Sequence, residues 1–245
     1  MPVESSWTRF IPGQSLTMTD PLVLSHFLFQ CLGHRVASSV RHHLEALEHD
    51  LHTKWSETLF TECFGTMAQL LGRTAVRLTD KEMVDLNGFG VMWKPSKTLD
   101  ELGRTAFLMI AATHLPDLLF QSQLQRCYDN GDPRERRAVL RTLPLLPEAE
   151  RFVPIAVDAC RSHVQPIFEA VACENFYPAG HFPERYFNQM VLKALFTGTS
   201  LDRIFGLERR VTEELLRMAA DYAAERLAAG RSVPMDIERL GWQMK

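Results

Sequence analysis

The sequence predicts an all-α protein, folded as a compact array of antiparallel helix pairs. Apolar residues recur at three- and four-residue spacing through most of the chain, which is the period of an amphipathic helix. The connections between these segments are short and rich in Pro, Gly and Asn. Helix pairs joined by short turns are typical of HEAT-like superhelices, although the sequence shows no regular internal repeat.

The N-terminal part of the chain contains an arm and two helical segments. Residues 1–19 are rich in Ser, Thr and Pro and predict an extended arm. Asp20 and Pro21 are a capping residue and a first-turn proline, so a helix is expected to begin there and continue to about residue 51, with a break near Gly33. A second helix is predicted at 53–73, which completes a set of N-terminal helices over residues 20–75.

Residues 76–98 have the weakest helical pattern of the chain. Gly88, Gly90 and Pro95 punctuate the segment, and aromatic residues lie between them. This composition predicts an irregular loop, with or without a small hairpin.

The helical pattern resumes at residue 99 and continues to the C-terminus. The run from Asn130 to Pro133 is a strong signal for the end of one helix and the start of the next, and Pro166 is expected to kink or split a long segment. The predicted helices span 99–114, 116–128, 133–145, 152–173, 182–196 and 207–229. No linker divides residues 1–245, so a single helical domain is expected, with residues 99–245 forming its helical array.

Composition and charge exclude several classes of protein. The net charge of −3 argues against binding to nucleic acid or to an anionic membrane surface. Arg134, Arg136 and Arg137 form a local basic cluster, interpreted as a solvated helix face because acidic residues lie among them.

The longest apolar run, residues 106–120, is too short and too interrupted to cross a bilayer. The five cysteines lack metal-site spacing and the N-terminus lacks a secretion signal, so a cytoplasmic location is expected.

Residues 161–196, here called the polar elbow, place ionisable and amide side chains inside two otherwise apolar helix patterns. Buried polar groups need hydrogen-bonding partners, so these side chains form either a structural network or a ligand pocket. In the structural alternative, Glu169 pairs with Arg161 or Lys193. In the other, the candidate ligand-binding residues are Arg161, Glu169, Asn175, Tyr177, Asn188, Gln189 and Lys193.

The sequence predicts no cofactor and no metal site. Phosphate-binding and nucleophile motifs are absent. A group of histidines near acidic residues is better explained as a solvated helix end, because it lacks a zinc-protease motif or a second matching motif; it comprises His42, His43, His49 and His52.

The polar elbow and the segments after it resemble the EboA family. The resemblance covers about residues 134–245 and is most specific at 168–172 (FEAVA), 175–179 (NFYPA), 187–196 (FNQMVLKALF), 206–210 (GLERR) and 228–231 (AAGR). It implies a role in secondary-metabolite biosynthesis or traffic. EboA-like proteins are associated with bacterial gene clusters for a UbiA-like prenyltransferase, metal hydrolase- and isomerase-like barrels and a dehydroquinate-synthase-like cyclase. The resemblance brings no established catalytic residues.

Two functions follow as hypotheses. The first is a non-catalytic helical adaptor that binds a small-molecule metabolite, the other proteins of its metabolite cluster, or both. The alternative is a small-molecule enzyme with a pocket around Glu169 as base, Asn188 as orienting group and Lys193 as electrostatic anchor.

Overall fold

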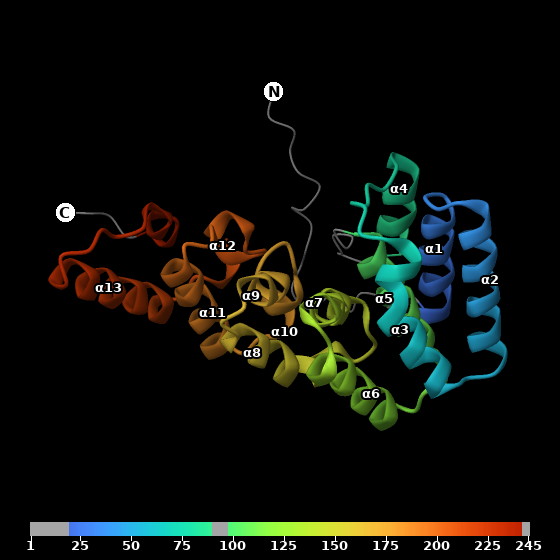
Figure 1. Cartoon of the computed structure of the whole chain (residues 1–245). Coiled ribbons are helices and arrows are strands. Elements are labelled where there is room, and N and C mark those ends of the chain that lie inside the picture. Colours follow the sequence, from blue (N-terminus) through green and yellow to red (C-terminus); the bar gives the residue numbers. More distant parts are fainter. Residues whose placement is uncertain (1–19, 90–97, 242–245) are drawn as a thin grey trace.

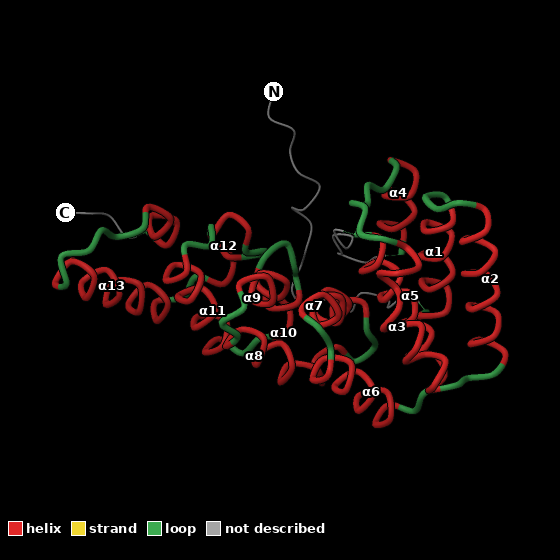
Figure 2. Tube along the Cα trace, in the orientation of Figure 1, coloured by secondary structure: helices red, strands yellow, loops and turns green. Residues whose placement is uncertain are grey.

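The computed structural model describes residues 20–89 and 98–241. Figure 2 shows helices joined by loops across these residues, with no strand among them. The all-α prediction is therefore confirmed for the described part of the chain. The predicted arm at residues 1–19 lies outside it.

Four of the first five helices lie in segments predicted to be helical, and the remaining one, α4, was not predicted. Asp20 caps the first helix by accepting a hydrogen bond from the Leu22 amide, and the break after Gly33 divides the predicted 22–51 segment in two. The helices are α1 (Pro21–Gly33), α2 (Ser38–Thr53), α3 (Glu57–Leu71), α4 (Asp80–Gly88) and α5 (Leu99–His114).

Helix α4 corrects the prediction that 76–98 is irregular throughout. Its start is fixed by a capping box, in which the Thr79 hydroxyl accepts from the Glu82 amide and the Glu82 carboxylate accepts from the Thr79 amide. An isolated antiparallel bridge pairs Ala75 with Thr98, so the ends of this segment lie together, while residues 90–97 lie outside the described residues.

The Glu82 carboxylate of α4 also binds Arg35 and His34, which follow α1. This contact makes the stability of the fold depend on pH. Arg35 donates two hydrogen bonds to this carboxylate and His34 lies 3.1 Å from it. The Arg35 hydrogen bond is the largest cause that holds the pKa of Glu82 far below its ordinary value. The stabilisation is therefore complete above the unfolded-state pKa of about 4.3, and it is lost as the pH falls toward the lowered pKa of the folded state.

We expect urea unfolding to show that the Glu82→Gln variant is less stable than the parent at neutral pH, and that the difference in the free energy of unfolding shrinks below about pH 4. A difference that does not change with pH would contradict this prediction.

The second half of the chain contains shorter helices than the sequence pattern predicts. The predicted 152–173 helix divides between Arg161 and Gln165, because Pro166 lies in the first turn of a new helix. The predicted 207–229 helix divides before Glu213, where the Thr212 hydroxyl caps the longer part. The elements are α6 (Asp117–Asn130), α7 (Pro133–Thr142), η2 (Leu143–Leu145), η3 (Ala149–Phe152), α8 (Val153–Arg161), α9 (Gln165–Ala172), α10 (Tyr177–His181), α11 (Glu184–Thr197), η4 (Leu201–Arg203), α12 (Leu207–Arg210), α13 (Glu213–Ala228) and η5 (Met235–Leu240).

The helices form an extended array, with α1 to α5 at one end and α13 at the other (Figure 1). Helix α5 packs against α1, α3 and α7, and α7 packs in turn against α9. Every residue from Leu99 to Ala111 in α5 is buried. Helices α5, α7 and α9 therefore form the central core, and α9 is the first complete helix of the polar elbow.

Within the described ranges, none of the helices combines the length and the apolar character needed to cross a membrane.

Candidate functional site

The turn between α9 and α10 is built around the buried side chain of Asn175. Its Nδ2 donates to the Ala170 carbonyl (3.0 Å) and to the Leu140 carbonyl of α7 (3.2 Å), while its Oδ1 accepts from the Tyr177 amide (3.0 Å). Both ends of the amide are thus used to close the turn and to hold it against α7.

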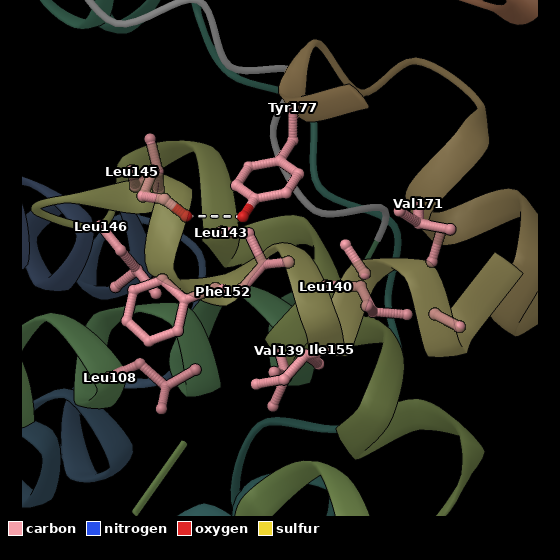
Figure 3. Packing of buried hydrophobic residues seen from close by; sticks show 14 of the residues in the cluster. Leu108, Val139, Leu140, Leu143, Leu145, Leu146, Phe152, Ile155, Val171 and Tyr177 are labelled. Atoms are coloured by element: carbon pink, nitrogen blue, oxygen red, sulfur yellow. Dashed lines mark hydrogen bonds between the residues drawn. The ribbon is translucent and has the colours of Figure 1, made fainter. Parts of the chain in front are cut away.

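Tyr177 extends this turn into the core. Its side chain is fully buried, and its hydroxyl donates to the Ala149 carbonyl of η3 over 2.5 Å. Figure 3 shows the ring pointing in among Leu143, Leu145 and Phe152, with the hydrogen bond drawn as a dashed line. Burial raises the pKa of Tyr177 far above its ordinary value, so the phenol stays protonated and remains a donor.

Two carboxylates of the polar elbow converge on Arg203, which the sequence analysis did not consider. Arg203 Nη1 donates to Glu169 Oε2 (2.7 Å), while its Nε and Nη2 donate to the two oxygens of Glu174 (2.8 and 3.1 Å). The Glu174 amide donates back to the Arg203 carbonyl over 2.8 Å. The guanidinium thus ties α9 and the following turn to η4, and the partner of Glu169 is Arg203 rather than the expected Arg161 or Lys193.

Gln165 continues this cluster toward the end of α11. Its Nε2 donates to Thr199 Oγ1 (2.7 Å) and to Glu169 Oε1 (3.3 Å). Both carboxylate oxygens of Glu169 therefore accept hydrogen bonds from the protein.

Lys193 is held by the end of α8. Its Nζ donates to the carbonyls of Cys160 and Ser162, each over 2.6 Å, and lies 4.9 Å from the centre of the Phe168 ring. A lysine at this place satisfies carbonyls that a helix leaves unpaired at its C-terminus. Burial lowers the pKa of Lys193, with the Cys160 thiol acting in the opposite direction.

The remaining candidates of the polar elbow differ in exposure. Asn188 is 1% exposed, and its Oδ1 has no hydrogen-bond partner among the described residues. Arg161 and Gln189 are exposed. The structure brings Glu169 together with Glu174 and Arg203, and it holds Lys193 on a separate set of groups at the end of α8.

A second polar cluster, missed by the sequence analysis, lies between α3, α5 and α7. Arg104 donates to Asp100 Oδ2 (2.8 Å) and to the Phe64 carbonyl (3.0 Å), and its Nη2 lies 3.8 Å from Glu135 Oε1. Both Asp100 and Arg104 are almost completely buried. The signal in the sequence is an acidic and a basic residue four apart at the start of an otherwise apolar helix.

Beside that pair, Arg137 of α7 bonds the buried carboxylate of Glu101 over 2.8 Å. This corrects the interpretation of the basic cluster as a solvated face: Arg137 is half-buried, and Arg136 donates to the Gly131 and Asp129 carbonyls. Arg137 therefore lies on the side of α7 that packs against α5.

Arg141, one turn further along α7, joins the two clusters electrostatically. Burial lowers its pKa, while the charges of Glu101 on one side and Glu174 on the other raise it. Charged groups therefore continue from the core of the N-terminal helices to the polar elbow.

Two surface cavities lie elsewhere in the described residues. The larger, here called the α1–α2 cleft, has a volume of about 310 Å³, and its lining residues are His26, Phe29, Gln30, Gly33, His34, Arg41, Leu44, Glu45 and Glu48. The smaller, of about 170 Å³, separates α3 from the α6–α7 junction. Among the residues described, no group of three or more His, Cys, Asp or Glu side chains is placed to hold a metal ion.

Comparison with known proteins gives one match. The family model described as "Metabolite traffic protein EboA" matches residues 24–242, nearly the whole chain and far beyond the C-terminal motifs that carried the resemblance. No curated protein and no solved structure matches the chain. Because this match covers nearly the whole chain, the chain belongs to the EboA family of metabolite traffic proteins.

Proposed function

We propose that this chain acts in secondary-metabolite traffic as a non-catalytic helical adaptor in the cytoplasm, where it binds a metabolite, the other proteins of its pathway, or both. The family description supports the role in metabolite traffic. The non-catalytic part rests on one observation: Glu169 is paired with Arg203, and Lys193 is bonded to two backbone carbonyls. Five free cysteines, buried or half-buried, support a reducing compartment.

The contacts of Glu169 and Lys193 favour a structural role for both. A general base must be free to approach the substrate proton, but Glu169 is held in place by Gln165 and Arg203, each of which donates to one of its two oxygens. An electrostatic anchor needs a free ammonium, but Lys193 donates to two carbonyls at the end of α8. These side chains hold α9 and α11 in place.

The Glu169→Gln variant separates the adaptor from the enzyme alternative. Its amide oxygen can still accept from Arg203, so the fold is expected to persist. For an adaptor, a host strain carrying only this variant should make pathway product within about twofold of the parent, whereas loss of a general base lowers a rate by about 10²- to 10⁴-fold. Product is measured by mass spectrometry at matched protein abundance, with Glu208→Gln, an exposed change on α12, as control.

Binding is tested in the same host. Affinity capture of the tagged chain followed by native mass spectrometry should recover a bound small molecule or proteins of the pathway. Recovery of neither, from cells that are making the metabolite, would contradict the proposal.

A further inference from the structure

The α1–α2 cleft combines an apolar floor with a polar rim. Phe29 and Leu44 are buried beneath it, at 6% and 2% exposure. At about 310 Å³ the cleft lies at the lower end of the range of about 300–1,000 Å³ that is usual for small-molecule sites. A ligand of modest size with one apolar face fits this shape.

The rim contains a carboxylate that the fold leaves poorly neutralised. The Glu48 side chain is only 14% exposed, and burial is the largest cause that raises its pKa. The hydrogen bond with His26 lowers that pKa, while the charge of Glu45, one turn away on α2, raises it. Arg41 lies 4.0 Å from Glu45 and offsets that charge rather than the charge of Glu48.

The partner of Glu48 is an exposed histidine that also contacts Gln30. His26 Nδ1 lies 3.2 Å from Glu48 Oε1, and His26 Nε2 lies 3.0 Å from Gln30 Nε2. If Nδ1 donates to the carboxylate, Nε2 is left to accept from the Gln30 amide, and the ring carries a single proton. In that arrangement His26 orients Glu48, and no lysine or arginine among the described residues forms an ion pair with Glu48.

We propose that the α1–α2 cleft binds a small organic amine, with the protonated nitrogen beside Glu48 and an apolar body against Phe29 and Leu44. The ammonium supplies a positive charge beside Glu48, which forms no ion pair with a lysine or arginine among the described residues, and the apolar body covers the floor of the cleft. The assignment rests on the metabolite-binding part of the proposed function and adds to it a place and a ligand class. An organic cation is favoured over a metal ion, because no metal-binding group of three is found among the described residues.

Three probes of nearly equal shape test the ligand class: 2-phenylethylamine, 2-phenylethanol and 3-phenylpropionate. At about pH 7.5, calorimetry should show the amine binding at least about tenfold more tightly than the alcohol or the acid. Nuclear magnetic resonance should place the shift changes on Phe29, Leu44 and His26. Equal affinity for amine and alcohol, shifts confined to other residues, or no binding at about 10 mM amine would overturn the proposal.

The Glu48→Gln variant tests the role of the carboxylate. It keeps the shape of the side chain, and we expect amine affinity to fall to the level of the neutral alcohol. Glu62→Gln, an exposed change on α3 outside the cleft, should leave the affinity unchanged. Gln30→Phe, which obstructs the cleft from its exposed rim, should abolish amine binding and provides a second test if Glu48→Gln fails to fold.

These experiments distinguish failure of the cleft assignment from failure of the proposed function. If the amine does not bind but affinity capture still recovers pathway proteins, the adaptor role stands and only the cleft assignment fails. If the amine binds and Glu169→Gln abolishes product formation, the non-catalytic role fails while the cleft remains a ligand site.

Discussion

Arg104→Met is expected to lower the free energy of unfolding by about 3–5 kcal/mol, the range measured when one partner of a buried ion pair is removed. Asp100 has no exposed side-chain surface, and Arg104 has 2%. Without the guanidinium, Asp100 keeps a buried charge whose other oxygen, Oδ1, already has no hydrogen-bond partner among the described residues. The Phe64 carbonyl also loses the hydrogen bond that Arg104 Nε donates to it.

Urea denaturation followed by circular dichroism measures this loss. The control is Arg126→Met, which breaks an ion pair with Glu57 in which both side chains are more than half exposed, and which should cost about 1 kcal/mol or less. The double variant Asp100→Leu/Arg104→Met should recover most of the loss, because it removes the uncompensated charge. A loss for Arg104→Met no larger than that of the control would show that the buried pair is not a source of stability.

Asn175→Ala is expected to cost about 2–4 kcal/mol, because it removes three hydrogen bonds from a buried turn. The carbonyls of Leu140 and Ala170 and the amide of Tyr177 all lose their partner. Each such buried group left unsatisfied costs about 1–3 kcal/mol, less what water entering the turn can restore.

The same denaturation assay measures the effect, with Asn87→Ala on the exposed surface of α4 as control, expected within about 0.5 kcal/mol of the parent. A stable Asn175→Ala variant that lost its bound metabolite would instead indicate a ligand-binding role for Asn175. The experiment therefore decides between the two interpretations that the sequence left open for this residue.

Helix positions were predictable where local signals and tertiary packing agree. The predicted helix at 99–114 coincides with α5, and the break at Pro166 was found because proline cannot continue the hydrogen-bond ladder of a helix. Helix α4 was missed, although Thr79 and Glu82 have the spacing of a capping box, because glycines and aromatic residues near it dominated the pattern.

The partners of the polar elbow were less predictable than its location. Helical spacing brought Glu169 and Lys193 to notice as polar groups near a core, but Arg203 reaches Glu169 across a separation of 34 residues through η4. The burial of Asp100 and Arg104 was hidden for a related reason. A charged pair four residues apart has the same spacing on a solvated surface as in a core, and only the packing of α3 and α7 around α5 decides between them.

The burial of α5 on all sides also bears on how this sequence can change over time. A residue from Leu99 to Ala111 has neighbours on several helices, so a substitution there must be matched by changes on more than one of them. Helix α13, in which only Leu215, Ala219 and Ala223 are buried, has most of its surface free of that constraint. We therefore expect sequence variation within the family to be low at the centre of α5 and to increase toward the outer end of the array.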